Sequence, residues 1–203
     1  MIGFHDSALT GRLVRLEPLE ERHIDGLYRA CTEDRASYSH TSVPQTLAQT
    51  RDYVASLLGE REAGQIIPFA QIRLRDSVTV GATRFMNFRK RDTDGRPFAV
   101  EIGGTWLAAS AQRTGLNVES KLLLLEHAFE DLQVTRVELR TDARNSRSRA
   151  AIAALGARLD GVLRSCEPSR AVGEEESLRD TAVYSIIVDD WEAVHTALIS
   201  RLR

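Results

Sequence analysis

The feature that most constrains the fold is an amphipathic helix with a wide apolar face, predicted for residues 118–132. Apolar residues recur there at intervals of three or four, at Val118, Leu122, Leu125, Phe129 and Leu132, and Leu123, Leu124 and Ala128 widen the face. A face this wide suits a helix that lies against a β-sheet. The leucine run at 122–125 is far too short to span a bilayer, so we expect no membrane segment.

Strand patterns surround this helix. Alternating apolar residues between turn signals predict strands at 11–18, 68–75, 77–85, 98–107, 135–141, 159–164 and 181–188. Helical spacing predicts further helices at 20–33, 46–63, 146–155 and 190–202. Gly156 stands where a helix needs a left-handed C-cap. A charged turn at 89–97, with Asp94-Gly95, and an acidic linker at 172–176 join neighbouring strands. This order of elements predicts a mixed α/β (α+β) fold.

Length and composition fit one domain. The chain has 203 residues, 42% of them apolar and 28% charged, which is enough for a core without disulfides. A formal net charge of -2 gives no overall basic footprint for nucleic acid. Cys31 and Cys166 form no CxxC pair, and residues 1–6 lack the basic and apolar pattern of a signal peptide. We therefore expect a cytoplasmic protein with reduced thiols, no metal, and no nucleic-acid or membrane partner.

The loop at 112–117 separates a predicted strand from the wide-faced helix. A helix that begins directly after a strand leaves backbone N–H groups unpaired at its positive end, and such an end binds phosphate. Gly115 lets the backbone approach a ligand closely, and Gln112 and Arg113 add donors. The loop lacks the Gly-Lys-Ser/Thr of a P-loop and two of the three glycines of the dinucleotide fingerprint. On these residues alone it is either an anion site or a simple turn.

Three blocks, in order, resemble the GNAT superfamily of N-acetyltransferases, and within it the RimJ/RimL-like branch. They are Glu101–Leu107 with 112–117 and Lys121–Leu125, then Arg136–Asn145 with Ser148 and Gly156, then Gly161–Arg164 with Leu178–Thr181 and Tyr184-Ser185. The opening Arg15–Leu19 and His23 also fit. The resemblance predicts one N-acetyltransferase domain over about residues 11–190, with 191–203 as a C-terminal helix packed on it.

The same resemblance implies a central, mixed and mostly antiparallel sheet, flanked by helices, that splays open between its fourth and fifth strands. Acetyl-CoA would lie in that gap as the cosubstrate. Its pyrophosphate would rest on the loop formed by Gln112, Arg113, Thr114, Gly115, Leu116 and Asn117. The backbone of Leu107 and Ala108 would border the thioester, where an N–H stabilises the oxyanion.

Residues at the start of the next helix are expected to hold the rest of the cosubstrate. By resemblance, Asn145 and Ser148 would bond the pantetheine arm. Asn145 is also a good N-cap for a helix that starts at Ser146, and both roles are compatible. Arg147 belongs to a group of arginines that either steer the anionic cosubstrate or form a solvated basic face.

The chemistry requires a base, because free amines titrate near pH ~8 to ~10 and acyl transfer needs them neutral. Glu101 is the leading candidate, since the family often uses a carboxylate on this strand. Pairing of Glu101 with an arginine is the structural alternative, and Glu138 is a weaker candidate. Many relatives carry a tyrosine acid where this chain has Ile152. Tyr184 is a substitute acid, against the alternative of a hydrogen-bonded core tyrosine or protonation by water.

The acceptor side rests on fewer signals. Tyr38 and His40 are candidates to line the acceptor pocket, although they are also typical of an exposed loop. Gly104 replaces an aromatic residue common among relatives, which predicts a larger pocket. The acidic run at 174–176 would attract a cationic acceptor or form a solvated turn. The acceptor itself is a primary amine of a small molecule, a peptide or a protein N-terminus.

The favoured function is therefore transfer of an acetyl group from acetyl-CoA to an amine by direct attack on the thioester. The rival is a non-catalytic acyl-CoA-binding or regulatory module on the same fold, because the missing tyrosine leaves the chemistry open. ATP binding at the loop is disfavoured by the absent Lys-Ser/Thr. Dimers are common among relatives, so a homodimer is a further hypothesis.

Overall fold

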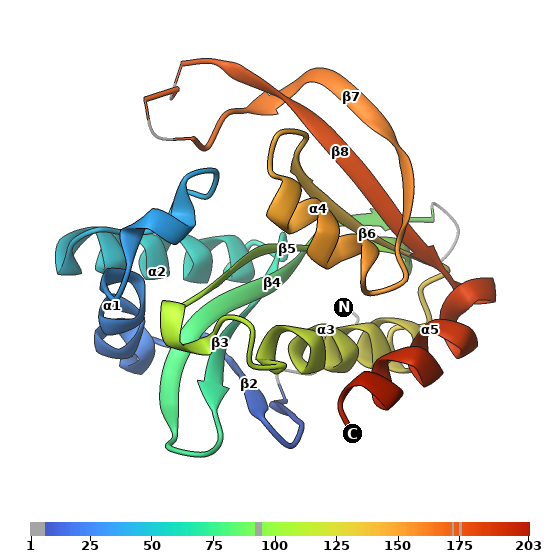
Figure 1. Ribbon diagram of the computed structural model, residues 1–203, viewed down its shortest axis with the longest axis horizontal. Coiled ribbons are helices and arrows are strands. Elements are labelled where there is room, and N and C mark those ends of the chain that lie inside the picture. Colours follow the sequence, from blue (N-terminus) through green and yellow to red (C-terminus); the bar gives the residue numbers. More distant parts are fainter. Residues whose placement is uncertain (1–6, 92–94, 172, 175) are drawn as a thin grey trace.

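The computed structural model describes residues 7–91, 95–171, 173–174 and 176–203. They form one eight-stranded sheet flanked by helices (Figure 1). In spatial order the strands are β1 (Leu9–Thr10), β2 (Val14–Pro18), β3 (Ile67–Arg73), β4 (Val78–Lys90), β5 (Pro97–Leu107), β6 (Arg136–Asp142), β8 (Leu178–Ile187) and β7 (Arg158–Pro168). All neighbouring pairs are antiparallel except β5 and β6, which run parallel. The predicted mixed, mostly antiparallel sheet is confirmed.

The main helices lie on both faces of this sheet. They are α1 (Ile24–Thr32), α2 (Leu47–Glu62), α3 (Leu116–Glu126), α4 (Ser146–Ala153) and α5 (Val188–Arg201). On β5, Trp106 donates to the Tyr53 hydroxyl of α2, whereas the neighbouring Thr105 accepts from Lys121 of α3. Because successive strand residues point to opposite faces, α2 and α3 cover opposite faces of the sheet. α5 packs on α3, and α4 packs on β6 and β8.

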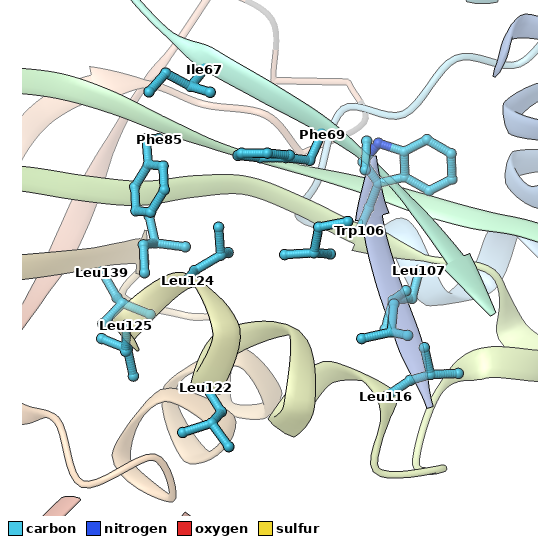
Figure 2. Close-up of a cluster of buried hydrophobic side chains, with 14 of the residues drawn as sticks. Ile67, Phe69, Phe85, Trp106, Leu107, Leu116, Leu122, Leu124, Leu125 and Leu139 are labelled. Atoms are coloured by element: carbon cyan, nitrogen blue, oxygen red, sulfur yellow. The ribbon is translucent and has the colours of Figure 1, made fainter. Parts of the chain in front are cut away.

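The core between α3 and the sheet follows from the wide apolar face of the helix. Figure 2 shows Leu124 projecting from α3 toward the strands that carry Phe69 and Phe85. Leu124, Leu125 and Phe85 are fully buried, and Phe69 nearly so. Burying such a side chain stabilises the fold by about 1.5–3 kcal/mol. This packing fixes α3, and with it the loop at its N-terminus, against the middle of the sheet.

Several boundaries differ from the sequence prediction. The expected charged turn at 89–97 is strand at both ends, because β4 continues to Lys90 and pairs it with Pro97, the first residue of β5. The last hairpin is longer than predicted, since β7 and β8 remain paired out to Pro168 and Leu178. α3 begins at Leu116, and a π-helical turn at His127–Asp131 replaces its predicted last turn. The ends of β4 and β7 carry mostly polar, exposed residues, so apolar periodicity alone could not predict that these segments are strands.

Some of the segments considered in the sequence lie outside the described residues, and one strand lies at the edge of the sheet with exposed apolar side chains. Residues 1–6, Asp94 of the predicted turn, and Val172 and Glu175 of the predicted linker lie outside the described residues. β7 is an edge strand of the sheet, and its exposed side chains include Leu159, Val162 and Leu163. Among the described residues, no helix is both long and apolar enough to cross a membrane.

Candidate active site

The parallel pair β5–β6 separates after only three residue pairs. The last of them joins Glu101 to Glu138. Beyond that point a cavity of about 490 Å³ lies between the diverging strands, lined also by α3, α4 and the β7–β8 hairpin. Glu101 is the first residue of β5 to line it. Since β1 is a two-residue strand, β5 and β6 are the fourth and fifth strands of the predicted splayed sheet.

The loop before α3 has the features of an anion site. Gly115 is the residue just before the helix, with a left-handed φ of 85°, and no side chain caps the helix. First-turn N–H groups are therefore available to a ligand. Arg113 is also left-handed, with φ 61°. A Cβ on Gly115 would lie 3.2 Å from Leu13 Cδ1, so glycine allows both the turn and the close packing. Loop residues that line the cavity are Gln112, Arg113, Gly115 and Asn117.

The start of α4 faces this loop across the cavity. Asn145 caps α4, because its Oδ1 accepts the Ser148 N–H at 3.0 Å, which confirms the capping alternative. Arg147 donates to Gln112 Oε1 at 3.3 Å. Gln112 in turn donates to the Leu107 carbonyl at 2.9 Å. A chain of side-chain hydrogen bonds thus joins α4, the loop and the end of β5.

The end of β5 offers one backbone N–H to the cavity. The Ala108 N–H donates to the Val80 carbonyl at 2.7 Å and is not available to a ligand. That bond makes Gly81 and Leu107 a non-hydrogen-bonded pair, which turns the Leu107 N–H away from β4 toward the splayed side. The Leu107 carbonyl points the same way and accepts from Tyr38 and Gln112. Of the two residues predicted from the sequence, the geometry favours Leu107.

The two candidate bases differ in environment. Glu101 is 7% exposed, and burial raises the pKa of its carboxyl, even though a 2.7 Å hydrogen bond from Asn87 and the charge of Arg140 act the other way. Arg140 Nε lies 3.4 Å from Glu101 Oε2, so the predicted arginine contact is also present. Burial also acts on Glu138, but hydrogen bonds from Arg136 and Arg140 and the charge of Arg89 lower its pKa. Glu138 is therefore held as a carboxylate, outside the cavity lining.

Of the tyrosine and histidine candidates, Tyr38 and His40 line the cavity and Tyr184 does not. Tyr184 is buried, accepts a hydrogen bond from Arg149 Nε at 3.1 Å, and is not among the cavity-lining residues. This geometry gives no support to Tyr184 as the acid. Tyr38 and His40 both line the cavity. The Tyr38 hydroxyl donates to the Leu107 carbonyl at 2.9 Å, so Tyr38 helps to position the end of β5.

Gly104 lies at a β-bulge that shapes the acceptor side. The register between β4 and β5 shifts between Ala82 and Arg84, leaving two β5 residues opposite one on β4. Gly104 has a left-handed φ of 57° there. A Cβ on it would lie 2.8 Å from Cζ of Arg84. The Arg84 guanidinium therefore occupies the space next to Gly104.

Lys121 is a buried amine on the face of β5 that α3 covers, opposite to the face that α2 covers. Its Nζ donates to Thr105 Oγ1 at 2.5 Å and to Thr83 Oγ1 at 3.4 Å. It is 5% exposed and lines the cavity from α3. Burial lowers the pKa of Lys121 to about 7. In the sequence, Lys121 stands directly before four consecutive leucines, which is the one sign that it could be buried. Periodicity alone does not distinguish a buried lysine from a solvent-exposed one at this position.

This burial predicts a pH-dependent stability. Between pH 7 and pH 9 the unfolded chain keeps the Lys121 proton while the folded chain loses it, so the free energy of unfolding rises with pH. The gain from this group is about 2 kcal/mol over that interval. Lys121→Met should abolish that rise, as measured by urea unfolding at both pH values. Lys90→Met, at an exposed lysine, is the matched control and should leave the rise intact. An equal rise in Lys121→Met and the parent chain would contradict the assignment.

Comparison with known proteins decides the family. The family model described as the Acetyltransferase (GNAT) domain matches residues 13–158. This chain is a GNAT acetyltransferase. The family comprises acyl-CoA-dependent N-acetyltransferases, and the match is to its RimJ/RimL-like group. No curated protein matches the sequence at a significant level.

Solved structures agree with this placement of the GNAT chain. A T. thermophilus protein described as an acetyltransferase is 31% identical, with 100% of both chains covered and a TM-score of 0.80. Mycobacterium smegmatis RimJ, solved with CoA-disulfide, is 21% identical over 97% of this chain and 92% of its own, with a TM-score of 0.77. RimL, described as a ribosomal L7/L12 alpha-N-protein acetyltransferase, is 18% identical over 90% and 94%, with a TM-score of 0.75.

The GNAT fold and a RimJ homologue bound to a CoA derivative imply that the chain binds acyl-CoA. The cavity between β5 and β6 fits such a molecule, because Glu101 and the loop before an uncapped helix N-terminus both line it. Among the described residues, no group of three or more His, Cys, Asp or Glu side chains is arranged to hold a metal ion.

Proposed function

We propose that this acetyltransferase moves the acetyl group of acetyl-CoA to a primary amine by direct attack of the amine on the thioester. The observation that carries the proposal is Glu101. It is a buried carboxylate with a raised pKa at the point where β5 and β6 separate. It shares one cavity with the loop before α3 and the start of α4. A base and a cosubstrate site therefore face the same space.

In this proposal the two ends of acetyl-CoA are held by different parts of the cavity. The backbone of Gln112–Asn117 binds the pyrophosphate, with Arg113 and Arg147 supplying positive charge. Asn145, which also caps α4, and Ser148 contact the pantetheine arm. The Leu107 N–H donates to the thioester carbonyl oxygen and stabilises the charge that develops there.

Glu101 supplies the proton acceptor. Directly or through one water, it takes a proton from the acceptor ammonium and leaves a neutral amine. The amine nitrogen attacks the carbonyl carbon, the C–S bond breaks, and CoA leaves as a thiolate. As the amide forms, one of the two protons left on the nitrogen passes to water and the other stays as the amide N–H, while the weakly basic CoA thiolate takes up a proton from water. A Tyr184 acid stays a prediction that this geometry does not support.

We propose the acceptor only as a class, namely a small-molecule amine or a peptide or protein N-terminus. RimL, which shares the fold, is described as acting on a ribosomal protein N-terminus, which supports the second alternative. The cavity extends to Tyr38 and His40, which we infer to contact the acceptor. One domain over about residues 11–190, with α5 packed on it, and a homodimer remain proposals.

Release of free thiol from acetyl-CoA tests this function. The purified chain is incubated with acetyl-CoA and a panel of amines, amino acids and peptides, and CoA thiol is measured against a reaction without acceptor. We expect acceptor-dependent thiol release and one acetyl group on the acceptor amine by mass spectrometry. Tight CoA binding by calorimetry with no turnover on any acceptor would instead identify a non-catalytic acyl-CoA-binding module.

A further inference from the structure

Outside the anion loop and α4, four arginines line the cavity, and two of them lack an acidic partner among the described residues. Arg84 and Arg170 line it, and neither forms an ion pair or hydrogen bond with any residue that the structure describes. Arg84 is partly buried, and its Nε is fully buried without a hydrogen-bond partner. The other two arginines on the β6–β8 side are engaged, since Arg140 and Arg179 both bond Glu167. A buried polar nitrogen without a partner costs free energy, so an anion that bonds Arg84 Nε would stabilise this site, and the exposed Arg170 lines the same cavity.

Both unpaired arginines lie close to Tyr53. Burial raises the pKa of Tyr53, while the charges of Arg84 and Arg170 act to lower it and that of Glu60 to raise it. The Tyr53 hydroxyl accepts a hydrogen bond from Trp106 and lines the same cavity. The two arginines and the Tyr53 hydroxyl therefore line one cavity, and both positive charges act on that hydroxyl. Such a set of donors is suited to a carboxylate or a phosphate.

The sheet register puts these groups on the acceptor side. Paired residues share a face, so the pairs Arg84–Gly103 and Met86–Glu101 place Arg84 and Glu101 on the same face of the sheet. This is the face that α2 covers, whereas the anion loop belongs to α3 on the opposite face. Arg84 and Glu101 are diagonal neighbours, a relation in which long side chains can reach each other. Gly104 leaves the space that the Arg84 guanidinium occupies.

We propose that Arg84, assisted by Arg170, binds an anionic group of the acceptor, so that the preferred acceptor is a small amine carrying a carboxylate or phosphate a few bonds from its nitrogen. This inference rests on the proposed acetyl transfer and names its substrate class. The anion is held at Arg84 while the amine reaches Glu101. A neutral amine of the same size lacks that contact and leaves the Arg84 guanidinium unpaired.

Matched acceptor pairs test the inference. One pair is an amino acid and its carboxamide, and the other is phosphoethanolamine and ethanolamine, each measured as kcat/KM by thiol release. We expect the charged member of at least one pair to be preferred by about 10-fold or more. The pair that shows the preference identifies the anion as carboxylate or phosphate. Arg84→Gln should remove the preference by raising the KM of the charged acceptor, with the KM for acetyl-CoA unchanged.

Controls separate this inference from a folding defect and from failure of the proposed function. Arg51→Gln, at an exposed arginine on α2, should keep the preference, and Arg84→Lys, which retains the charge, should keep part of it. Equal use of both members of each pair, or a preference unchanged in Arg84→Gln, would overturn the anion site while acetyl transfer stands. If no acceptor releases thiol, the proposed function fails. In that case, calorimetric titration of the CoA-bound chain with inorganic phosphate and with an amino acid tests whether the anion site at Arg84 exists. Binding weakened about 10-fold or more in Arg84→Gln supports the site, and no binding overturns it.

Discussion

Replacing Glu101 by glutamine is expected to lower kcat/KM for acetyl transfer by about 10²–10⁴-fold, the usual contribution of a general base. Glutamine keeps the size of the side chain and can still accept the hydrogen bond from Asn87, which is 2.7 Å from the carboxylate in the parent chain. It cannot take a proton from the acceptor ammonium. The measurement is kcat/KM for the acceptor by thiol release at saturating acetyl-CoA, together with the midpoint of thermal unfolding to show that the variant is folded.

The pH profile makes this test specific. A base works only when deprotonated, so activity should rise with pH through the pKa of Glu101. Burial raises that pKa above its usual 4.5, so this acid limb should lie at a higher pH than for an exposed glutamate. The limb should vanish in Glu101→Gln. Glu138→Gln is the control, because Glu138 is the paired residue on β6 and its arginine partners keep its pKa low. Retention of both rate and limb in Glu101→Gln would exclude Glu101 as the base.

Local chemistry explains which parts of the site the sequence could predict. Gly156 adopts the left-handed φ that its C-cap position predicted. Asn145 caps α4 through the side-chain bond that its position before Ser146 predicted. The splay between β5 and β6 followed from resemblance. The first features depend only on residues that are near each other in the sequence. The splay depends on a family motif, whose residues occur together.

The remaining features depend on register and on contacts between distant segments. Arg84 reaches the acceptor side only because a bulge at Gly104 sets which β4 residue faces the cavity. Alternation along a strand could not tell that Tyr184 would turn away from the cavity toward Arg149. Lys121 pointed inward because Thr83 and Thr105, from two other elements, meet its amine. No pattern in a single segment contains that information.

Glu119 is the clearest example of such a distant contact, and replacing it by glutamine is expected to destabilise the fold by about 3 kcal/mol. Its buried carboxylate accepts three backbone N–H groups at the start of β2, from Arg12 at 2.9 Å, Leu13 at 2.6 Å and Val14 at 2.8 Å. Gly11 is required beside it, since a Cβ there would lie 2.5 Å from the carboxyl carbon. A glutamine has one acceptor oxygen, so its NH₂ group would face at least one N–H and leave it unsatisfied.

The loss of these hydrogen bonds in Glu119→Gln should also disturb the cosubstrate site. Glu119 lies in the first turn of α3, and Leu13, which it holds, packs against Gly115 in the anion loop. We therefore expect Glu119→Gln to weaken CoA binding as well as to lower the free energy of urea unfolding, with little change in acceptor KM. Glu126→Gln on the same helix is the matched control, because its bond to His195 is about one-third exposed and contributes little. A Glu119→Gln variant as stable as this control would show that the three N–H groups find other partners. Reduced stability with unchanged CoA affinity would show instead that β2 and the anion loop are not coupled through Leu13.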